Sequence, residues 1–193
     1  MYIPFNRVSC SDEDLHCVAS YLETSTPESE FAILEKATES LRDLLKVKSI
    51  ILTGSCTQAL ELSALLVGIQ PGDEVIVPSY TFPSTANAFA LRGAKVIFAD
   101  CRADSPHVGT DEIVRCLTDR TKAVVVMHYA GIACELDGIL PLLDDRGIVL
   151  IEDAAHAVGA SYQGKPLGTF GRYGAFSFHR SKNISLSLIH ISE

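Results

Sequence analysis

The chain has 193 residues, of which 47% are hydrophobic and 21% are charged, and its formal net charge is -8. This balance is typical of a soluble globular domain, and the length suits one ordinary core or one large lobe of a bigger protein. The acidic balance and the lack of a basic stripe argue against a nucleic-acid surface, so we expect no nucleic-acid partner.

The sequence shows no sign of membrane insertion or of a disulfide framework. No apolar run approaches the roughly 18 to 20 residues of a spanning helix, and the opening MYIPFNRVS is not typical of a signal peptide. Six cysteines are scattered without CxxC or Cys/His metal spacing, at positions 10, 17, 56, 101, 116 and 134. We therefore expect a cytoplasmic protein with free thiols, no metal site and no membrane contact.

Residues 12–45 have helical periodicity. Ser11 can cap a first helix, and a second helix is predicted to follow Pro27. The period then changes. The short β-branched run SIILT at 49–53 is predicted to be a strand, and the next helix is predicted to open at Ser55.

From that point apolar strands and helices alternate. We predict strands at 74–78, 95–100, 122–128, 148–153 and 173–178, with helices at 83–92, 110–117 and 136–146. Short apolar strands between helices favour parallel pairing with both faces buried. The sequence thus predicts an α/β domain of three layers, in which helices flank a mostly parallel sheet.

Polar clusters follow several of these strands. They are TGSCT (53–57), SYTF (79–82), HYAG (128–131) and EDAAH (152–156). Ligands of open parallel sheets bind beyond the carboxyl ends of the strands, so the clusters fall on one expected ligand rim. Within TGSCT, the free N–H groups of a helix start suit a phosphate, although an ordinary N-cap explains the same residues.

Acidic, aromatic and histidine side chains on this rim each have two explanations. Asp153 can cap the following helix or pair with a protonated heteroaromatic nitrogen. Glu152 points to the opposite face if the strand alternates, which makes it the weaker candidate. His156 can reach a phenolic or phosphate oxygen or be structural. Phe82 can stack on a flat ligand or be buried under the next helix.

Lys182 follows the last predicted strand, in SFHRSKN, a few residues after the hydroxyl of Ser177. A lysine in a surface loop is ordinarily a solvated charge. A lysine near both a phosphate site and a carboxylate-bound ring nitrogen is the arrangement that pyridoxal phosphate (PLP) chemistry needs.

The sequence resembles the DegT/DnrJ/EryC1/StrS family of sugar aminotransferases. The likeness is carried by TGSCTQALELSALL, PGDEVIVPSYTFPSTANAFALRGAKVIFAD, HYAG, IEDAAHAVGASYQGKPLGTFG and FSFHRSKN, and it covers nearly all of residues 1–183. It implies the large domain of the type I fold of PLP-dependent transferases, PLP as cofactor, and a homodimer with active sites at the interface.

The resemblance also implies the reaction. Lys182 matches the lysine that binds PLP covalently and then moves the substrate proton, and Asp153 matches the partner of the pyridine nitrogen. The implied substrates are glutamate, as amino donor, and a dTDP-4-keto-6-deoxyhexose. The product is a 4-amino-4,6-dideoxy sugar nucleotide of the kind used for lipopolysaccharide and enterobacterial common antigen.

Further cofactor contacts follow from the same resemblance. Thr57 and Gln58 match the pair that holds the phosphate, with help from the hydroxyl of Ser177. Phe82 matches the aromatic residue that stacks on the ring, and His156 matches the residue near the phenolic oxygen.

One departure from the family lies at the end of the chain. The family continues after Asn183 with a glycine-rich turn and a long C-terminal part, whereas this chain ends in ISLSLIHISE at 184–193. We expect 1–183 to be an incomplete PLP-binding large domain and 184–193 to be a non-native tail. Because the C-terminal small domain is missing, we expect the fragment to be inactive alone.

Two other functions remain open at this stage. Cys56 stands at a predicted helix start, which would lower its pKa and suit a thiol enzyme. Alternatively, the chain is a non-catalytic relative that binds PLP or a sugar nucleotide, an interpretation that the presence of Lys182 disfavours. Indifference to PLP would favour the first alternative, and PLP binding without amino transfer would favour the second.

Overall fold

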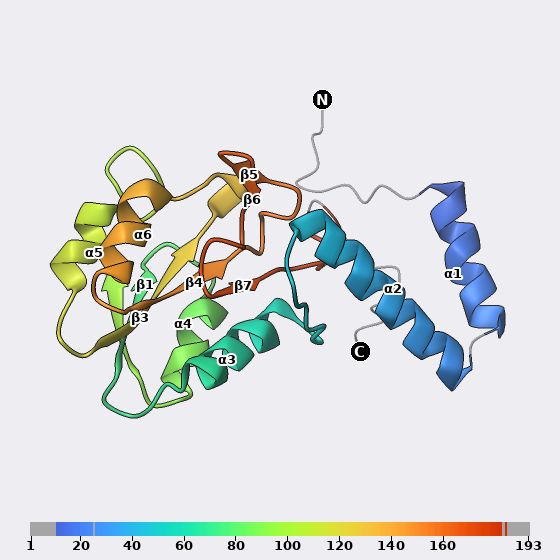
Figure 1. Cartoon of the computed structure of the whole chain (residues 1–193), viewed down its shortest axis with the longest axis horizontal. Helices are drawn as coiled ribbons and strands as arrows, with labels where there is room; N and C mark the ends of the chain where they lie inside the picture. The colour runs from blue at the N-terminus through green and yellow to red at the C-terminus, as the bar shows by residue number, and fades with distance from the viewer. Residues whose placement is uncertain (1–10, 25, 183, 185–193) are drawn as a thin grey trace.

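The computed structural model describes residues 11–24, 26–182 and 184. The opening MYIPFNRVS, Cys10 and the tail from 185 to 193 therefore lie outside the described residues. Two helices come first, α1 (Asp12–Thr24) and α2 (Pro27–Leu45), and Figure 1 shows them to one side of the α/β body. The predicted cap of the first helix is confirmed, because Ser11 Oγ accepts the N–H of Asp14 at 3.1 Å.

Five parallel strands form the main sheet, in the order β2-β1-β3-β4-β7. Their bounds are β1 (Glu74–Pro78), β2 (Lys95–Ala99), β3 (Thr121–Met127), β4 (Val149–Asp153) and β7 (Tyr173–Ala175). The other helices are α3 (Cys56–Val67), α4 (Pro83–Ala90), α5 (Thr110–Cys116), α6 (Leu136–Asp144) and the short 3-10 turn η1 (Tyr129–Gly131). A separate antiparallel pair joins β5 (Ser161–Tyr162) to β6 (Lys165–Pro166).

Alternation along the strands creates two hydrophobic layers. On one face, Val75 and Val77 pack with Leu60 of α3 and Phe89 of α4. On the other face, Ile76 packs with residues of α5 and α6, including Ile113, Ile139 and Leu143. Figure 1 shows the two helix pairs on opposite sides of the sheet. The predicted three-layer α/β architecture is confirmed.

The strand predicted at 49–53 is wrong. The segment is irregular, with side-chain exposures of 64% for Ile51 and 41% for Leu52. A strand needs a neighbour for its backbone N–H and C=O groups, and no described segment pairs with this one. The predicted strand at 173–178 is also shorter than expected, because only Tyr173–Ala175 pair with β4.

No helix in the described part of the chain is both long and apolar enough to cross a membrane.

A buried glutamate fixes the amino end of the sheet. Glu74, the first residue of β1, is only 1% exposed. Its carboxylate accepts hydrogen bonds from Thr118 Oγ1 at 2.6 Å, Arg120 Nη2 at 2.6 Å and Lys95 Nζ at 3.2 Å. These bonds, first that of Thr118 and then that of Arg120, lower the pKa of Glu74 from 4.5 to about 2.

The Glu74 contacts predict a defined acid sensitivity. Because the folded-state pKa is depressed, the stabilisation is present above pH 4.5 and is lost as the pH falls towards about 2. We expect Glu74→Gln to lose stability near neutral pH and to show a weaker decline across that acid window. Urea unfolding followed by circular dichroism at several pH values measures this. The exposed Glu39→Gln is the control, and equal acid curves for Glu74→Gln and the unmodified chain would contradict the prediction.

Candidate active site

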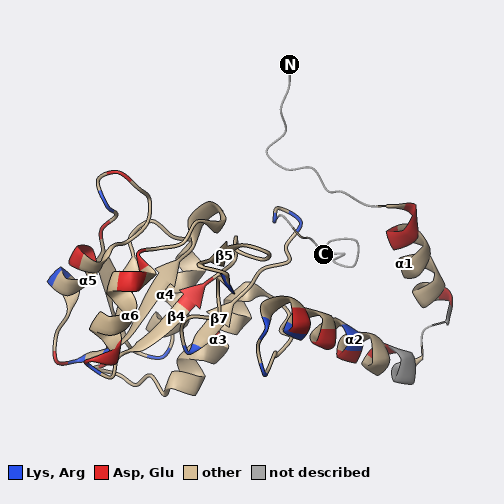
Figure 2. Cartoon of the chain, turned by 45° about the horizontal axis from the view of Figure 1, so that its top comes forward, with Lys and Arg blue, Asp and Glu red and all other residues tan. Residues whose placement is uncertain are grey.

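Asp153 is the last residue of β4, and its carboxylate is held in a defined position. Figure 2 shows the acidic end of this strand, where Glu152 and Asp153 are neighbours. Asp153 is 2% exposed. Thr85 Oγ1, from α4, donates to Asp153 Oδ2 at 2.7 Å, and the N–H of Ala155 donates to Oδ1 at 3.1 Å. The carboxylate therefore lies on the face covered by α4, anchored but still able to accept another donor.

Lys182 lies at the same rim of the sheet. Its N–H donates to the carbonyl of His179 at 2.8 Å, and its side chain is half-buried. The Lys182 ammonium and the Asp153 carboxylate both act electrostatically on Cys56 and on His156. Across the described residues, the ammonium makes no ion pair with a carboxylate. The two opposite charges thus surround one region without neutralising each other directly.

His156 lies within the electrostatic influence of both charges and against the ring of Tyr129. Its Nδ1 accepts the N–H of Ala130 at 3.2 Å, and its ring contacts that of Tyr129 edge-on, with centroids 5.4 Å apart. Burial lowers the pKa of His156, and the nearby charge of Lys182 lowers it further. The hydrogen bond to Nδ1 leaves the Nε2 position to carry the proton of the neutral ring.

The start of α3 combines an ordinary N-cap with unused donors. Ser55 Oγ accepts the N–H of Gln58 at 3.2 Å, and Gln58 Oε1 accepts the N–H of Gly54 at 2.8 Å. The N–H groups of Cys56 and Thr57 find no acceptor in the part of the chain that the structure describes. Free donors at the start of a 12-residue helix suit an anionic group such as a phosphate.

Ser177 and Phe82 occupy contrasting environments. Ser177 is 8% exposed, and its Oγ accepts the N–H of His179 at 3.4 Å. Phe82 caps the start of α4 and is 69% exposed. Burial under the next helix, one of the two explanations offered for Phe82, is therefore wrong, and its ring is available for stacking.

Thr85 and the tyrosines Tyr80 and Tyr129 also lie at this rim, and the sequence did not identify them as site residues. Thr85 is fully buried and donates to Asp153, a contact that depends on how α4 packs over β4. The ring of Tyr80 meets that of Tyr129 edge-on at 5.2 Å. Tyr80 lies in the polar cluster SYTF and Tyr129 in HYAG, so the sequence placed both tyrosines at the rim. It did not predict that their rings are in contact.

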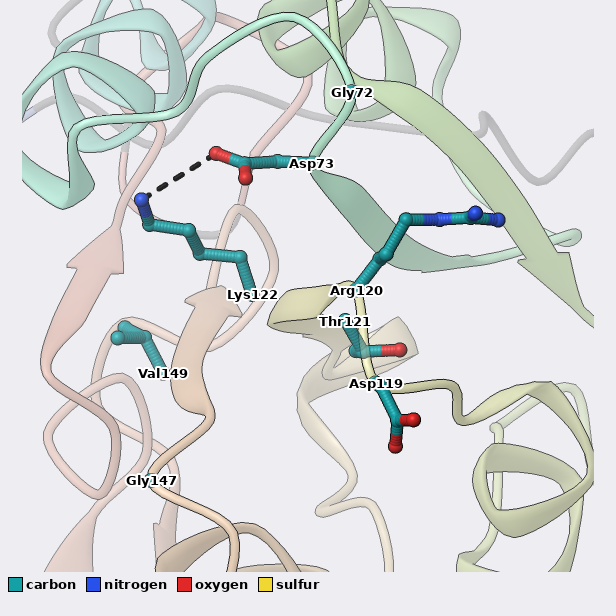
Figure 3. Close-up of a pocket in the computed structure, with 8 residues that line it drawn as sticks. All are labelled: Gly72, Asp73, Asp119, Arg120, Thr121, Lys122, Gly147 and Val149. Atoms are coloured by element: carbon teal, nitrogen blue, oxygen red, sulfur yellow. Dashed lines mark ion pairs between the residues drawn. The ribbon is translucent and has the colours of Figure 1, made fainter.

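The chain also has a depression at the other end of the sheet, near the amino ends of β1, β3 and β4. It has a volume of about 440 Å³ and is lined by Gly72, Asp73, Asp119, Arg120, Thr121, Lys122, Gly147 and Val149 (Figure 3). Lys122 Nζ lies 3.4 Å from Asp73 Oδ2 and donates to the carbonyl of Gly68 at 3.2 Å. The depression is open and its lysine is already paired. Ligands of parallel sheets bind beyond the carboxyl ends of the strands, so we place the candidate site there.

The expected low pKa of Cys56 is wrong. Burial raises the pKa of the Cys56 thiol to about 12, and the carboxylate of Asp153 adds to this, although Lys182 partly opposes it. The lowering of the pKa that a helix start causes is outweighed, because the Cys56 thiolate would be desolvated beside another negative charge. The structure thus opposes a thiol enzyme. Free thiols are confirmed for the described cysteines Cys17, Cys56, Cys101, Cys116 and Cys134.

Thiol alkylation tests the assignment of Cys56. We expect iodoacetamide at neutral pH to modify Cys56 at least about tenfold more slowly than the exposed Cys17, because almost none of Cys56 is thiolate. Peptide mass spectrometry against time provides both rates in one sample. Faster labelling of Cys56 than of Cys17 would restore the thiol-enzyme hypothesis.

Comparison with known proteins decides the family. The model of the DegT/DnrJ/EryC1/StrS aminotransferase family matches residues 12–187. The chain belongs to this family. It is 42% identical over 150 residues to the uncharacterized protein MJ1066 of Methanocaldococcus jannaschii, a match that spans 78% of this chain and 39% of that protein.

Solved structures of aminotransferases share the fold. Spr1654 of Streptococcus pneumoniae, named as a candidate sugar aminotransferase, superposes in its PLP form with a TM-score of 0.85 and 26% identity, over 95% of this chain and 50% of that one. Helicobacter pylori PseC, an aminotransferase involved in the biosynthesis of pseudoaminic acid, gives 0.81 and 26% over 94% and 49%. This DegT-family chain has the PLP-dependent aminotransferase fold and spans half or less of these relatives.

Proposed function

We propose that residues 1–183 form the PLP-binding large domain of a nucleotide-sugar aminotransferase, and that Lys182 is the lysine that binds PLP covalently. The observation that carries the proposal is the carboxylate of Asp153, held by Thr85 and Ala155 at the carboxyl end of β4, with Lys182 in the segment that follows the neighbouring strand β7. An unpaired amine and an anchored carboxylate at the carboxyl ends of a parallel sheet fit the two ends of a pyridoxal ring. Family membership and fold support the same assignment.

The remaining rim residues fit the other groups of the cofactor. The free N–H groups at the start of α3, with Thr57, Gln58 and Ser177, would hold the phosphate. The exposed ring of Phe82 would stack on the pyridine ring, and His156 would face the phenolic oxygen.

Each side chain then has a chemical task. Bound PLP supplies an electron sink for the electrons that remain when the donor's α-proton departs. Asp153 keeps the ring nitrogen protonated, which sustains that capacity. Lys182 Nζ would accept the donor's α-proton as a base and then give it back as an acid. The lowered pKa of His156 keeps its imidazole neutral. The neutral ring would orient the phenolic oxygen of the cofactor through a hydrogen bond.

We further propose glutamate as the amino donor and a dTDP-4-keto-6-deoxyhexose as the acceptor, with a homodimer as the working form. The segments SCTQALE, PSYTFPSTANAFALRGAK and HYAGIACELD most resemble dTDP-4-amino-4,6-dideoxygalactose transaminase of enterobacterial common antigen synthesis. The presence of sugar aminotransferases among the structural relatives supports the substrate class.

Reductive trapping tests the proposal. A full-length enzyme that carries this segment is incubated with PLP, reduced with borohydride and digested. We expect the cofactor on the peptide that contains Lys182, and none after Lys182→Ala, because reduction makes the bond to that amine permanent. The exposed Lys165→Ala is the matched control and should trap normally. Trapping elsewhere, or none in the unmodified enzyme, would overturn the lysine assignment.

The same enzyme tests the substrates. With glutamate and dTDP-4-keto-6-deoxyglucose, we expect 2-oxoglutarate and an amino sugar nucleotide in equal amounts. Trapping at Lys182 without any amino transfer would instead support the non-catalytic relative.

A further inference from the structure

Glu152 is a buried carboxylate with four hydrogen bonds to which the proposed reaction gives no task. It is 0% exposed in the middle of the protein, on the face of the sheet opposite to Asp153. Its Oε1 accepts the N–H groups of Phe170 and Gly171, both at 2.6 Å. Its Oε2 accepts the N–H of Gly168 at 2.8 Å and bonds to His128 Nε2 at 2.8 Å.

The hydrogen bonds assign the ionic state of this group. His128 is also 0% exposed, and its Nδ1 accepts the N–H of Cys134 at 3.3 Å. The proton therefore sits on Nε2, and His128 is a neutral donor to Glu152. Four donors converge on one carboxylate, which is the pattern of an anion rather than a neutral acid. A buried anion is costly unless it is fully bonded, so the local backbone is organised around it.

The bound backbone leads directly to the proposed lysine. Residues 168–171 precede β7, and β7 precedes Ser177 and Lys182 in the chain. Among the described residues, β7 pairs with β4 alone, through Ile151↔Tyr173, Glu152↔Gly174 and Asp153↔Ala175. Three residue pairs specify a register weakly, and a slip of two residues would move the following chain by about 6.6 Å.

We propose that Glu152 is the positioning residue for Lys182: by binding three amides of 168–171, it fixes the register of β7 and thereby the place of the lysine at the rim. Lys182 as the covalent lysine rests on the proposed function, whereas the contacts of Glu152 do not. Two adjacent residues of β4 thus have different roles on the two faces of the sheet. Asp153 lies on the face of the proposed cofactor site, and Glu152 binds the segment that precedes β7 and Lys182.

The sheet contains a matched control for this role. Glu74 is also a buried carboxylate with several donors, but it lies at the amino end of β1, away from β7. Glu152→Gln and Glu74→Gln each replace one acceptor oxygen by an NH₂ group that faces existing donors. Both variants should lower the urea midpoint, so stability alone does not separate them.

Two readouts on the full-length enzyme separate positioning from stability. Hydrogen exchange without cofactor should become faster at 168–182 in Glu152→Gln, and at the amino ends of β1 and β2 in Glu74→Gln. In folded protein, the rate of borohydride-trapped PLP at Lys182 should fall at least about tenfold in Glu152→Gln and remain within about twofold in Glu74→Gln. Glu152→Asp, which keeps the charge, should recover part of the rate.

Several outcomes would overturn the proposal. Equal trapping rates in the two glutamine variants would reduce Glu152 to a stability role. If Glu152→Gln does not fold, the unmodified enzyme still decides the matter. There the amides of Gly168, Phe170 and Gly171 should exchange as slowly as those of β7, and rapid exchange at these three would contradict the inference. If the unmodified enzyme fails to trap PLP at Lys182, the proposed function fails, while the exchange contrast still tests Glu152.

Discussion

Asp153→Asn should lower the transamination rate of a full-length enzyme by about 10²–10³-fold, the usual cost of removing one preorganised electrostatic partner. The asparagine can still accept the N–H of Ala155 and contact Thr85, so the local structure should survive. It has no negative charge, however, and a neutral amide does not hold a proton on the ring nitrogen. We therefore expect the loss mainly in kcat, measured with glutamate and the keto-sugar nucleotide.

The control for Asp153→Asn is Asp144→Asn, at the exposed end of α6. It makes the same chemical change far from the rim and should leave kcat within about twofold. Thermal unfolding of both variants shows whether the fold is retained. A folded Asp153→Asn enzyme with normal kcat would mean that this carboxylate is only a structural anchor for α4 and the loop after β4.

Phe89→Ala should destabilise the chain by about 3–5 kcal/mol, the range for truncating a fully buried aromatic side chain. Phe89 is 0% exposed and belongs to the layer between α3, α4 and the sheet. Its removal leaves a cavity beneath the helix that carries both Phe82 and Thr85. We expect a lower urea midpoint and, in a full-length enzyme, weaker PLP binding, because α4 positions Thr85 against Asp153.

Leu91→Ala is the matched control for Phe89→Ala. Leu91 lies two residues after Phe89, at the end of α4, but is 72% exposed. Its truncation should therefore cost less than about 0.5 kcal/mol of stability. Urea unfolding of the two variants under identical conditions gives the comparison. Similar losses for both would show that the α3–α4 layer is not the stabilising core that its burial indicates.

The sheet was predictable because its strands are short apolar runs separated by turn and cap residues. Every strand of the main sheet was located, since burial on both faces leaves a strong sequence signal. The short antiparallel pair β5–β6 was not predicted. The run at 49–53 carries the same β-branched composition, yet it has no paired neighbour among the described residues. Composition reports the preference of a segment, whereas pairing depends on what lies beside it in space.

The rim residues were predictable to a different degree. Alternation along β4 correctly placed Glu152 and Asp153 on opposite faces. The helix-start argument failed for Cys56, because burial and the carboxylate of Asp153 outweigh the favourable effect of the helix end. Thr85 was missed, since its bond to Asp153 joins residues 68 positions apart and arises only when α4 packs on the sheet. Contacts of this kind have no local sequence signature.

The position of β7 in the chain has a consequence for how the protein is made. Among the described residues this strand pairs with β4 alone, and it follows β1, β2, β3 and β4 in the chain. In a nascent polypeptide, the carboxylate of Asp153 is therefore synthesised before the amine of Lys182, which completes the proposed site. Newly made molecules should accordingly become competent for the cofactor only after β7 has docked on β4, rather than during synthesis of the central strands.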